Sequence, residues 1–148
     1  MIYKPSKFRN YTILLLVLSA FEFCAKKVVL TDIEFQRQLL AGTGTYQNME
    51  RNWRLDSSFI NGAAVVLTPY QRTYVKTFMH DGVYKDSEMN NGKWELPALN
   101  TLKQKITYST SNKVDSSSFE ILLLNAAQLK LKLINSSIKA EYSFKIVN

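Results

Sequence analysis

The chain has 148 residues and a formal net charge of +7, with 46% hydrophobic and 21% charged residues. This length fits one domain, and these proportions are those of a globular protein, which excludes wholesale disorder. The single cysteine, Cys24, excludes an internal disulfide framework and a cysteine-based zinc site. The eight tyrosines and eight phenylalanines favour β-structure.

The basic charge is modest and scattered along the chain. Residues 1–23 hold the cations Lys4, Lys7 and Arg9 and the anion Glu22, and without them the formal charge is +5. Since no long run of like charges occurs, we interpret the excess as a solvated basic surface rather than a nucleic-acid site. We therefore expect no nucleic-acid partner.

The first 23 residues predict a signal peptide. Lys4, Lys7 and Arg9 precede an apolar run over residues 11–21. The run is shorter than the about 20 apolar residues that a transmembrane helix needs, and a short apolar helix behind cations is typical of an export signal.

Cys24 follows this run by three residues, as the acylated cysteine does in bacterial lipoprotein signals. Phe21 and Phe23 stand where such signals usually have Leu and a small residue. Lipidation of Cys24 is the favoured interpretation. Cleavage after Ala20 to give a soluble protein, an uncleaved anchor, and a buried helix with an inert cysteine are the alternatives.

Residues 24–31 then form a tether, and residues 32–148 form the folded domain. Thr31 or Asp32 can cap a helix, with apolar residues at helical spacing behind it. Gly42 and Gly44 would end that helix, so we expect it over residues 32–41.

From Trp53 onward the hydrophobic period is two, which predicts strands. The alternation is clearest over residues 128–134, where leucines alternate with lysines, and over residues 140–146. Asp81-Gly82 and Asn91-Gly92 predict hairpin turns.

Two further segments are expected to interrupt the strands. Pro97 should end its strand, because proline cannot continue a central strand. Residues 109–118, rich in Ser, Thr and Asn, should form a polar loop.

The resulting fold class is all-β, with about eight strands. Short loops force antiparallel neighbours, because parallel strands need long crossovers. A meander of this size exposes two edges unless it closes, so we predict an up-and-down barrel with a short helix before it.

Short motifs follow one another along this domain. They are Leu39-Leu40-Ala41-Gly42, Asn52-Trp53-Arg54-Leu55-Asp56, Asn61-Gly62, Leu67-Thr68, Thr77-Phe78, Asp81-Gly82-Val83-Tyr84 and Gly92-Lys93-Trp94-Glu95-Leu96. In this order they resemble the lipocalin-like domain of small lipoproteins from Bacteroidetes-type bacteria, over about two thirds of the chain. The resemblance implies an up-and-down barrel in which Trp53 closes one end. It brings no agreed substrate and no catalytic residues.

Aromatic residues are the candidate ligand-binding set. An aromatic-lined concavity with a few polar groups is typical of a small-molecule site, although in a barrel of this size the same rings can fill the interior. The candidates are Tyr74, Phe78, Tyr84, Trp94, Tyr108, Tyr142 and Phe144.

Catalytic residues are not evident. His80 is the only histidine and precedes the Asp81-Gly82 turn, where we expect it to be solvated. Alternation places Glu95 and Glu120 on the outer face, so they cannot form a catalytic pair. The sequence therefore predicts no enzyme, no cofactor and no metal site.

Two functions remain open at this stage. The first is a lipid-anchored protein of a bacterial cell envelope, attached to the membrane through Cys24, whose barrel holds a small apolar or amphipathic ligand. The alternative is an accessory lipoprotein with a solid barrel that docks a protein partner. The first predicts an internal cavity, and the second predicts a packed interior and an exposed apolar patch.

Overall fold

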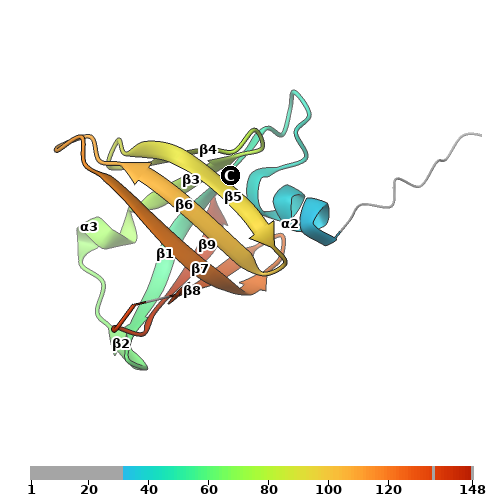
Figure 1. Ribbon diagram of the computed structural model, residues 1–148. Helices are drawn as coiled ribbons and strands as arrows, with labels where there is room; N and C mark the ends of the chain where they lie inside the picture. Colours follow the sequence, from blue (N-terminus) through green and yellow to red (C-terminus); the bar gives the residue numbers. More distant parts are fainter. Residues whose placement is uncertain (1–31, 135, 148) are drawn as a thin grey trace, which may run out of the picture.

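The computed structural model describes residues 32–134 and 136–147 (Figure 1). The predicted signal peptide, Cys24 and the tether lie outside the described residues. Within them, no helix has the length and apolarity needed to cross a membrane.

The described residues form two helices and nine strands. The helices are α2 (Asp32–Ala41) and α3 (Pro69–Arg72). The strands are β1 (Glu50–Ile60), β2 (Ala63–Val65), β3 (Val75–Met79), β4 (Val83–Asp86), β5 (Asn91–Ala98), β6 (Thr101–Thr107), β7 (Val114–Leu124), β8 (Gln128–Ile134) and β9 (Ala140–Val147).

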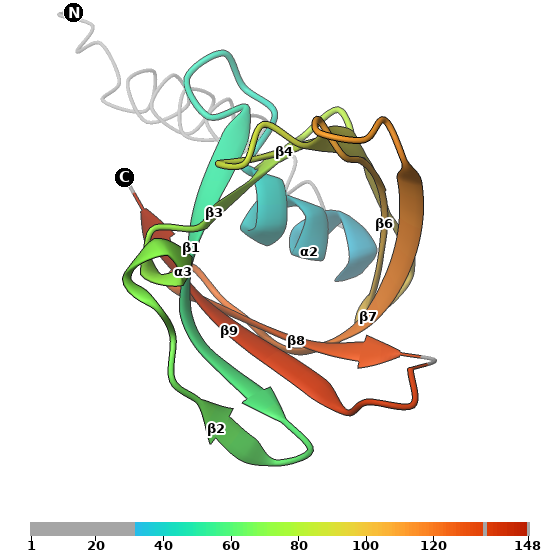
Figure 2. The same ribbon diagram turned by 90° about the vertical axis from the view of Figure 1, so that its left-hand side faces the viewer.

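The strands close into an antiparallel barrel. From β3 to β9 each strand pairs with the next in sequence, and β1 pairs with both β3 and β9. The ring therefore has eight strands, as predicted, and Figure 2 shows it end-on, with the view down the barrel axis. The short β2 stands outside the ring and pairs with the last residues of β1.

Helix α2 lies across one end of the barrel, and α3 lies at the other end (Figures 1 and 2). The predicted bounds of α2 are confirmed. Its residues Leu40 and Ala41 are fully buried, and the indole Nε1 of Trp53 donates a hydrogen bond to the Leu40 carbonyl at 2.8 Å. A buried carbonyl is costly to leave unpaired, so this bond fixes α2 on the barrel end.

Helix α3 was not predicted, although its start has a recognisable sequence signal. Thr68 and Gln71 form a capping box, in which each side chain pairs with the other residue's backbone N–H, and Pro69 occupies the first turn. This single helical turn places Tyr70 beside the end of the barrel that α2 leaves open.

Buried aromatic rings pack against one another next to α2. The rings of Tyr84 and Trp94 each meet Phe78 edge-on, with centroids 5.6 and 5.7 Å apart. Trp53 and Phe78 are fully buried, and Trp94 is 4% exposed. Edge-to-face pairs of this kind add stability beyond the area they bury, so this end of the barrel is a solid core.

The predicted hairpin turn at Asn91-Gly92 is wrong. Both residues lie in β5, where Gly92 pairs with Tyr84 on one side and with Ile106 on the other. The turn comes earlier, and Met89 adopts a φ of 63° there. Gly92 is needed for a different reason, since a Cβ atom at this position would collide with the Lys105 carbonyl.

Two other expected interruptions are also wrong. Pro97 lies within β5, where a register shift between Glu95 and Ala98 removes the need for its N–H. The predicted polar loop at 109–118 is shorter, because β7 begins at Val114 and its serines pair with residues 103–105 of β6. Polar composition there reflects an exposed strand, not a loop.

Candidate functional site

A cavity of about 380 Å³ occupies the half of the barrel away from α2. Tyr70 and Gln71 of α3 line it together with residues from every strand of the ring except β5. The lining residues are Leu55, Tyr70, Gln71, Tyr74, Lys76, Asp86, Glu88, Asn90, Gln104, Ile106, Tyr108, Ser117, Phe119, Leu133, Tyr142 and Phe144.

The structure divides the predicted aromatic set in two. Tyr74, Tyr108, Tyr142 and Phe144 line the cavity. The other predicted residues, Phe78, Tyr84 and Trp94, do not line it, and they are buried in the same hydrophobic cluster as Phe144. Periodicity alone does not say which of the inward-facing rings border the cavity.

Lys76 is the functional candidate that sequence reasoning missed. It points inward from β3, and its Nζ lies 3.1 Å from Oε1 of Gln104. The rings of Tyr84, Phe119 and Phe144 also surround it, with centroids 5.5 to 5.8 Å from Nζ. The signal was its place in the alternation between inward-facing residues 74 and 78.

Burial lowers the pKa of the Lys76 ammonium to about 8, and the carboxylate of Asp86 partly opposes this shift. Removing a charged group from water disfavours its charged form, whereas the aromatic faces and Asp86 favour it. Because this pKa lies above neutrality, Lys76 remains mostly a cation at pH 7.

Gln104 presents an unpaired donor beside that cation. The side chain is 2% exposed, and its Nε2 is the one buried side-chain nitrogen or oxygen atom without a partner in the described part of the chain. The orientation of the amide follows from Lys76, because a flipped amide would set two donors against each other. A buried donor without an acceptor costs about 1–3 kcal/mol.

Asp86 faces Lys76 across the β3–β4 pair but its oxygens are engaged elsewhere. Oδ2 accepts hydrogen bonds from the hydroxyls of Tyr74 and Tyr84 at 3.1 and 3.0 Å. The backbone N–H of Asn90 donates to Oδ1 at 3.1 Å. Burial raises the pKa of both tyrosines, so their hydroxyls stay protonated and continue to donate.

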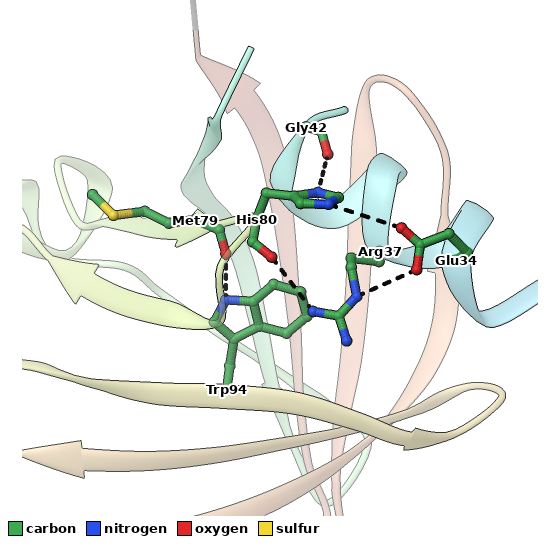
Figure 3. A network of polar contacts seen from close by, with 6 residues as sticks. All are labelled: Glu34, Arg37, Gly42, Met79, His80 and Trp94. Atoms are coloured by element: carbon green, nitrogen blue, oxygen red, sulfur yellow. Dashed lines mark hydrogen bonds and ion pairs between the residues drawn. The ribbon is translucent and has the colours of Figure 1, made fainter. Parts of the chain in front are cut away.

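A polar network holds α2 over the closed end of the barrel (Figure 3). Nδ1 of His80 lies 2.8 Å from the Gly42 carbonyl, and Nε2 lies 3.8 Å from a Glu34 carboxylate oxygen. Arg37 lies over the Trp94 ring and 3.7 Å from Glu34. The prediction that His80 is solvated is wrong, because the segment after α2 folds over the β3–β4 turn.

A larger hollow of about 640 Å³ lies over the outer face of β5 to β7. It is bordered by outward-facing side chains, among them Lys93, Lys103 and Lys105, all of which are exposed. Water hydrates these exposed ammonium groups, so an ion pair with a ligand there would gain little free energy. The inner cavity is therefore the better candidate site, although this outer hollow is larger.

Other candidate chemistry is sparse in the described ranges. Glu95 and Glu120 are exposed, in agreement with the prediction that they face outward. Each lies near a lysine of a neighbouring strand, at 4.0 and 3.1 Å. No group of three or more His, Cys, Asp or Glu side chains that could hold a metal ion occurs among residues 32–134 and 136–147.

Comparison with family models, with curated proteins and with solved structures finds no match to this chain. The resemblance to lipocalin-like lipoproteins therefore stays a prediction from the sequence, while the barrel itself is a property of the structure.

Proposed function

We propose that this protein binds a small amphipathic molecule inside its barrel. The observation that carries the proposal is the open cavity, whose lining combines polar and apolar side chains. Tyr74 just before β3, Lys76 on β3 and Asp86 on β4 contribute polar groups, and Leu55, Leu133 and Phe144 contribute apolar ones. A molecule with a polar and an apolar part can satisfy both kinds of side chain.

The size of the cavity supports this proposal. At about 380 Å³ it lies at the small end of the roughly 300–1,000 Å³ that small-molecule sites span. The alternative function, a solid barrel that docks a protein, predicts a packed interior. The packing next to α2 fits that alternative, but the opposite half of the barrel does not.

The proposal includes a place in the cell. A lipid on Cys24 would hold the barrel at a bacterial membrane, in the cell envelope, as the apolar run before this residue predicts. We propose binding rather than catalysis, and no nucleic-acid partner. These parts of the proposal depend on the sequence pattern.

The experiment fills the cavity and measures the binding of a neutral probe. Leu133→Trp places a large ring among the apolar lining residues. With the fluorescent probe N-phenyl-naphthylamine, we expect this variant to bind at least about tenfold more weakly than the wild type, a difference of about 1.4 kcal/mol. Fluorescence titration gives both dissociation constants.

The matched control is Leu122→Trp, which adds the same ring to a leucine that is 44% exposed on the outer face. This variant should bind the probe as the wild type does. If the wild type binds no probe, or if Leu133→Trp binds as tightly as Leu122→Trp, the barrel interior is not a ligand site.

A further inference from the structure

We propose that the ligand is a monocarboxylate that enters the barrel with its carboxylate first, to be held by Lys76 Nζ and Gln104 Nε2. This inference rests on the proposed function and adds to it the chemical class of the ligand and the orientation in which it binds. It depends on two donors, one charged and one unpaired, that share one place in the wall of the cavity.

The ammonium of Lys76 has bonding capacity left for a ligand. It carries three N–H donors, and its one hydrogen-bond partner within the described ranges is Oε1 of Gln104. No carboxylate of those residues lies within ion-pair distance of Nζ, since Asp86 is engaged with Tyr74 and Tyr84. The rings around Nζ favour a cation but accept no conventional hydrogen bond.

Gln104 supplies the second, independent observation. Its Nε2 is buried and unpaired, and it belongs to the same amide group whose oxygen accepts from Lys76. A small turn of this side chain toward the cavity would bring Nε2 within reach of a ligand, and an acceptor with two oxygens could then accept hydrogen bonds from both Nε2 and the Lys76 ammonium. A carboxylate has this form, and hydrogen bonds with charged partners are about twice as strong as neutral ones.

The surroundings favour a single negative charge and one direction. Asp86, the strand partner of Lys76, would repel a dianion more strongly than a monoanion. Buried rings adjoin both donors, since Phe78 follows Lys76 by two residues on β3 and Trp94 is the strand partner of Gln104, and this packing leaves no room for a tail. The apolar part of the ligand therefore extends toward the mouth, past Ile106 and Tyr142.

The first experiment compares decanoate with decanol, which have the same chain and differ in the head group. Calorimetric titration of the full chain should give at least about tenfold tighter binding of decanoate, because only the carboxylate gains the charge-assisted bonds. Equal affinities for the two compounds would overturn the head-group proposal and leave the proposed binding function intact.

The decisive variant is Gln104→Glu, which has nearly the same shape. The new carboxylate would pair with Lys76 inside the protein and repel the carboxylate of the ligand. We expect the preference for decanoate to disappear while N-phenyl-naphthylamine still binds. Lys76→Met should also lose the preference, and its probe binding reports whether that variant folds.

The charge-matched control is Gln128→Glu, on the exposed outer face of β8. It should keep the preference for decanoate. Retained preference in Gln104→Glu would overturn the assignment of these donors. Absence of decanoate, decanol and probe binding in the wild type would instead contradict the proposed function, so the two failures are distinguishable.

Discussion

A half-buried lysine that has no ion-pair partner among the described residues should leave a signature in the stability of the protein. The pKa of Lys76 falls from 10.5 to about 8 on folding, mainly because of burial, with Asp86 opposing the shift. Between these two values the unfolded chain binds more protons than the folded chain, so the free energy of unfolding rises with pH. The cost of burying the charge is present below about pH 8 and is relieved above it.

The magnitude follows from the size of the shift, at 1.36 kcal/mol per unit, reduced because Lys76 reaches the solvent in the cavity. Relative to Lys76→Met, the wild type should gain about 2–3 kcal/mol between pH 8 and pH 10.5. Tyr74 and Tyr84 face the same site, but their titration occurs in both proteins and cancels in the comparison.

Urea unfolding of both proteins across this pH range measures the difference. A pH-independent difference would mean that Lys76 has its ordinary pKa and that the cavity is well hydrated.

The alternation over residues 74–80 puts Lys76 on the same side of its strand as Tyr74 and Phe78, but nothing in the sequence marks it as a site residue. Alternation says which side chains share a face, and Trp53, Trp94 and Phe144, which lie on such inward faces, are all buried. It does not say how deep each lies along the barrel. That depth depends on pairing between distant strands, such as the approach of Gln104 on β6 to Lys76 on β3.

At the scale of elements, the close approach of β5 and β6 at Gly92 predicts a large effect of substitution on stability. Gly92→Ala should destabilise the protein by about 3 kcal/mol or more, because the new methyl group would overlap the Lys105 carbonyl and force the strands apart. Thermal or urea unfolding measures the loss.

The control for this prediction is Gly62→Ala. At Gly62 a Cβ atom would meet nothing within 4 Å, although its φ of +83° is strained for alanine. We expect a loss of about 1 kcal/mol for that variant, from backbone strain alone. Equal losses in the two variants would show that β5 and β6 are farther apart than described.

The errors of sequence reasoning at this scale have physical causes. Asn91-Gly92 has the composition of a hairpin turn, but its glycine serves a close approach of two strands. Likewise, Ser116 to Ser118 read as a loop, although small polar residues suit a strand whose outer face is solvated. Composition reports exposure and backbone freedom, whereas the choice between turn and strand depends on the neighbouring strand.

At the scale of the whole molecule, the first described helix and the mouth of the cavity lie at opposite ends of the barrel. The described chain begins with α2 at one end of the barrel, and α3 lies at the other end (Figure 1). Tyr70 and Gln71 of α3 line the cavity, so we take its mouth to be at that end. Residues 25–31 span at most about 25 Å when fully extended. A barrel anchored through Cys24 would therefore stand with its closed end nearer the membrane and its mouth toward the water.

This arrangement predicts that anchoring and binding are separable. Cys24→Ser should release the protein from washed membranes, and mass spectrometry should show the loss of the acyl chains from the N-terminus. Its affinity for decanoate should equal that of the anchored protein, because the mouth is remote from the tether. Continued membrane association would contradict lipidation. A changed affinity would instead mean that the membrane covers the mouth, so that the ligand enters from the lipid rather than from water.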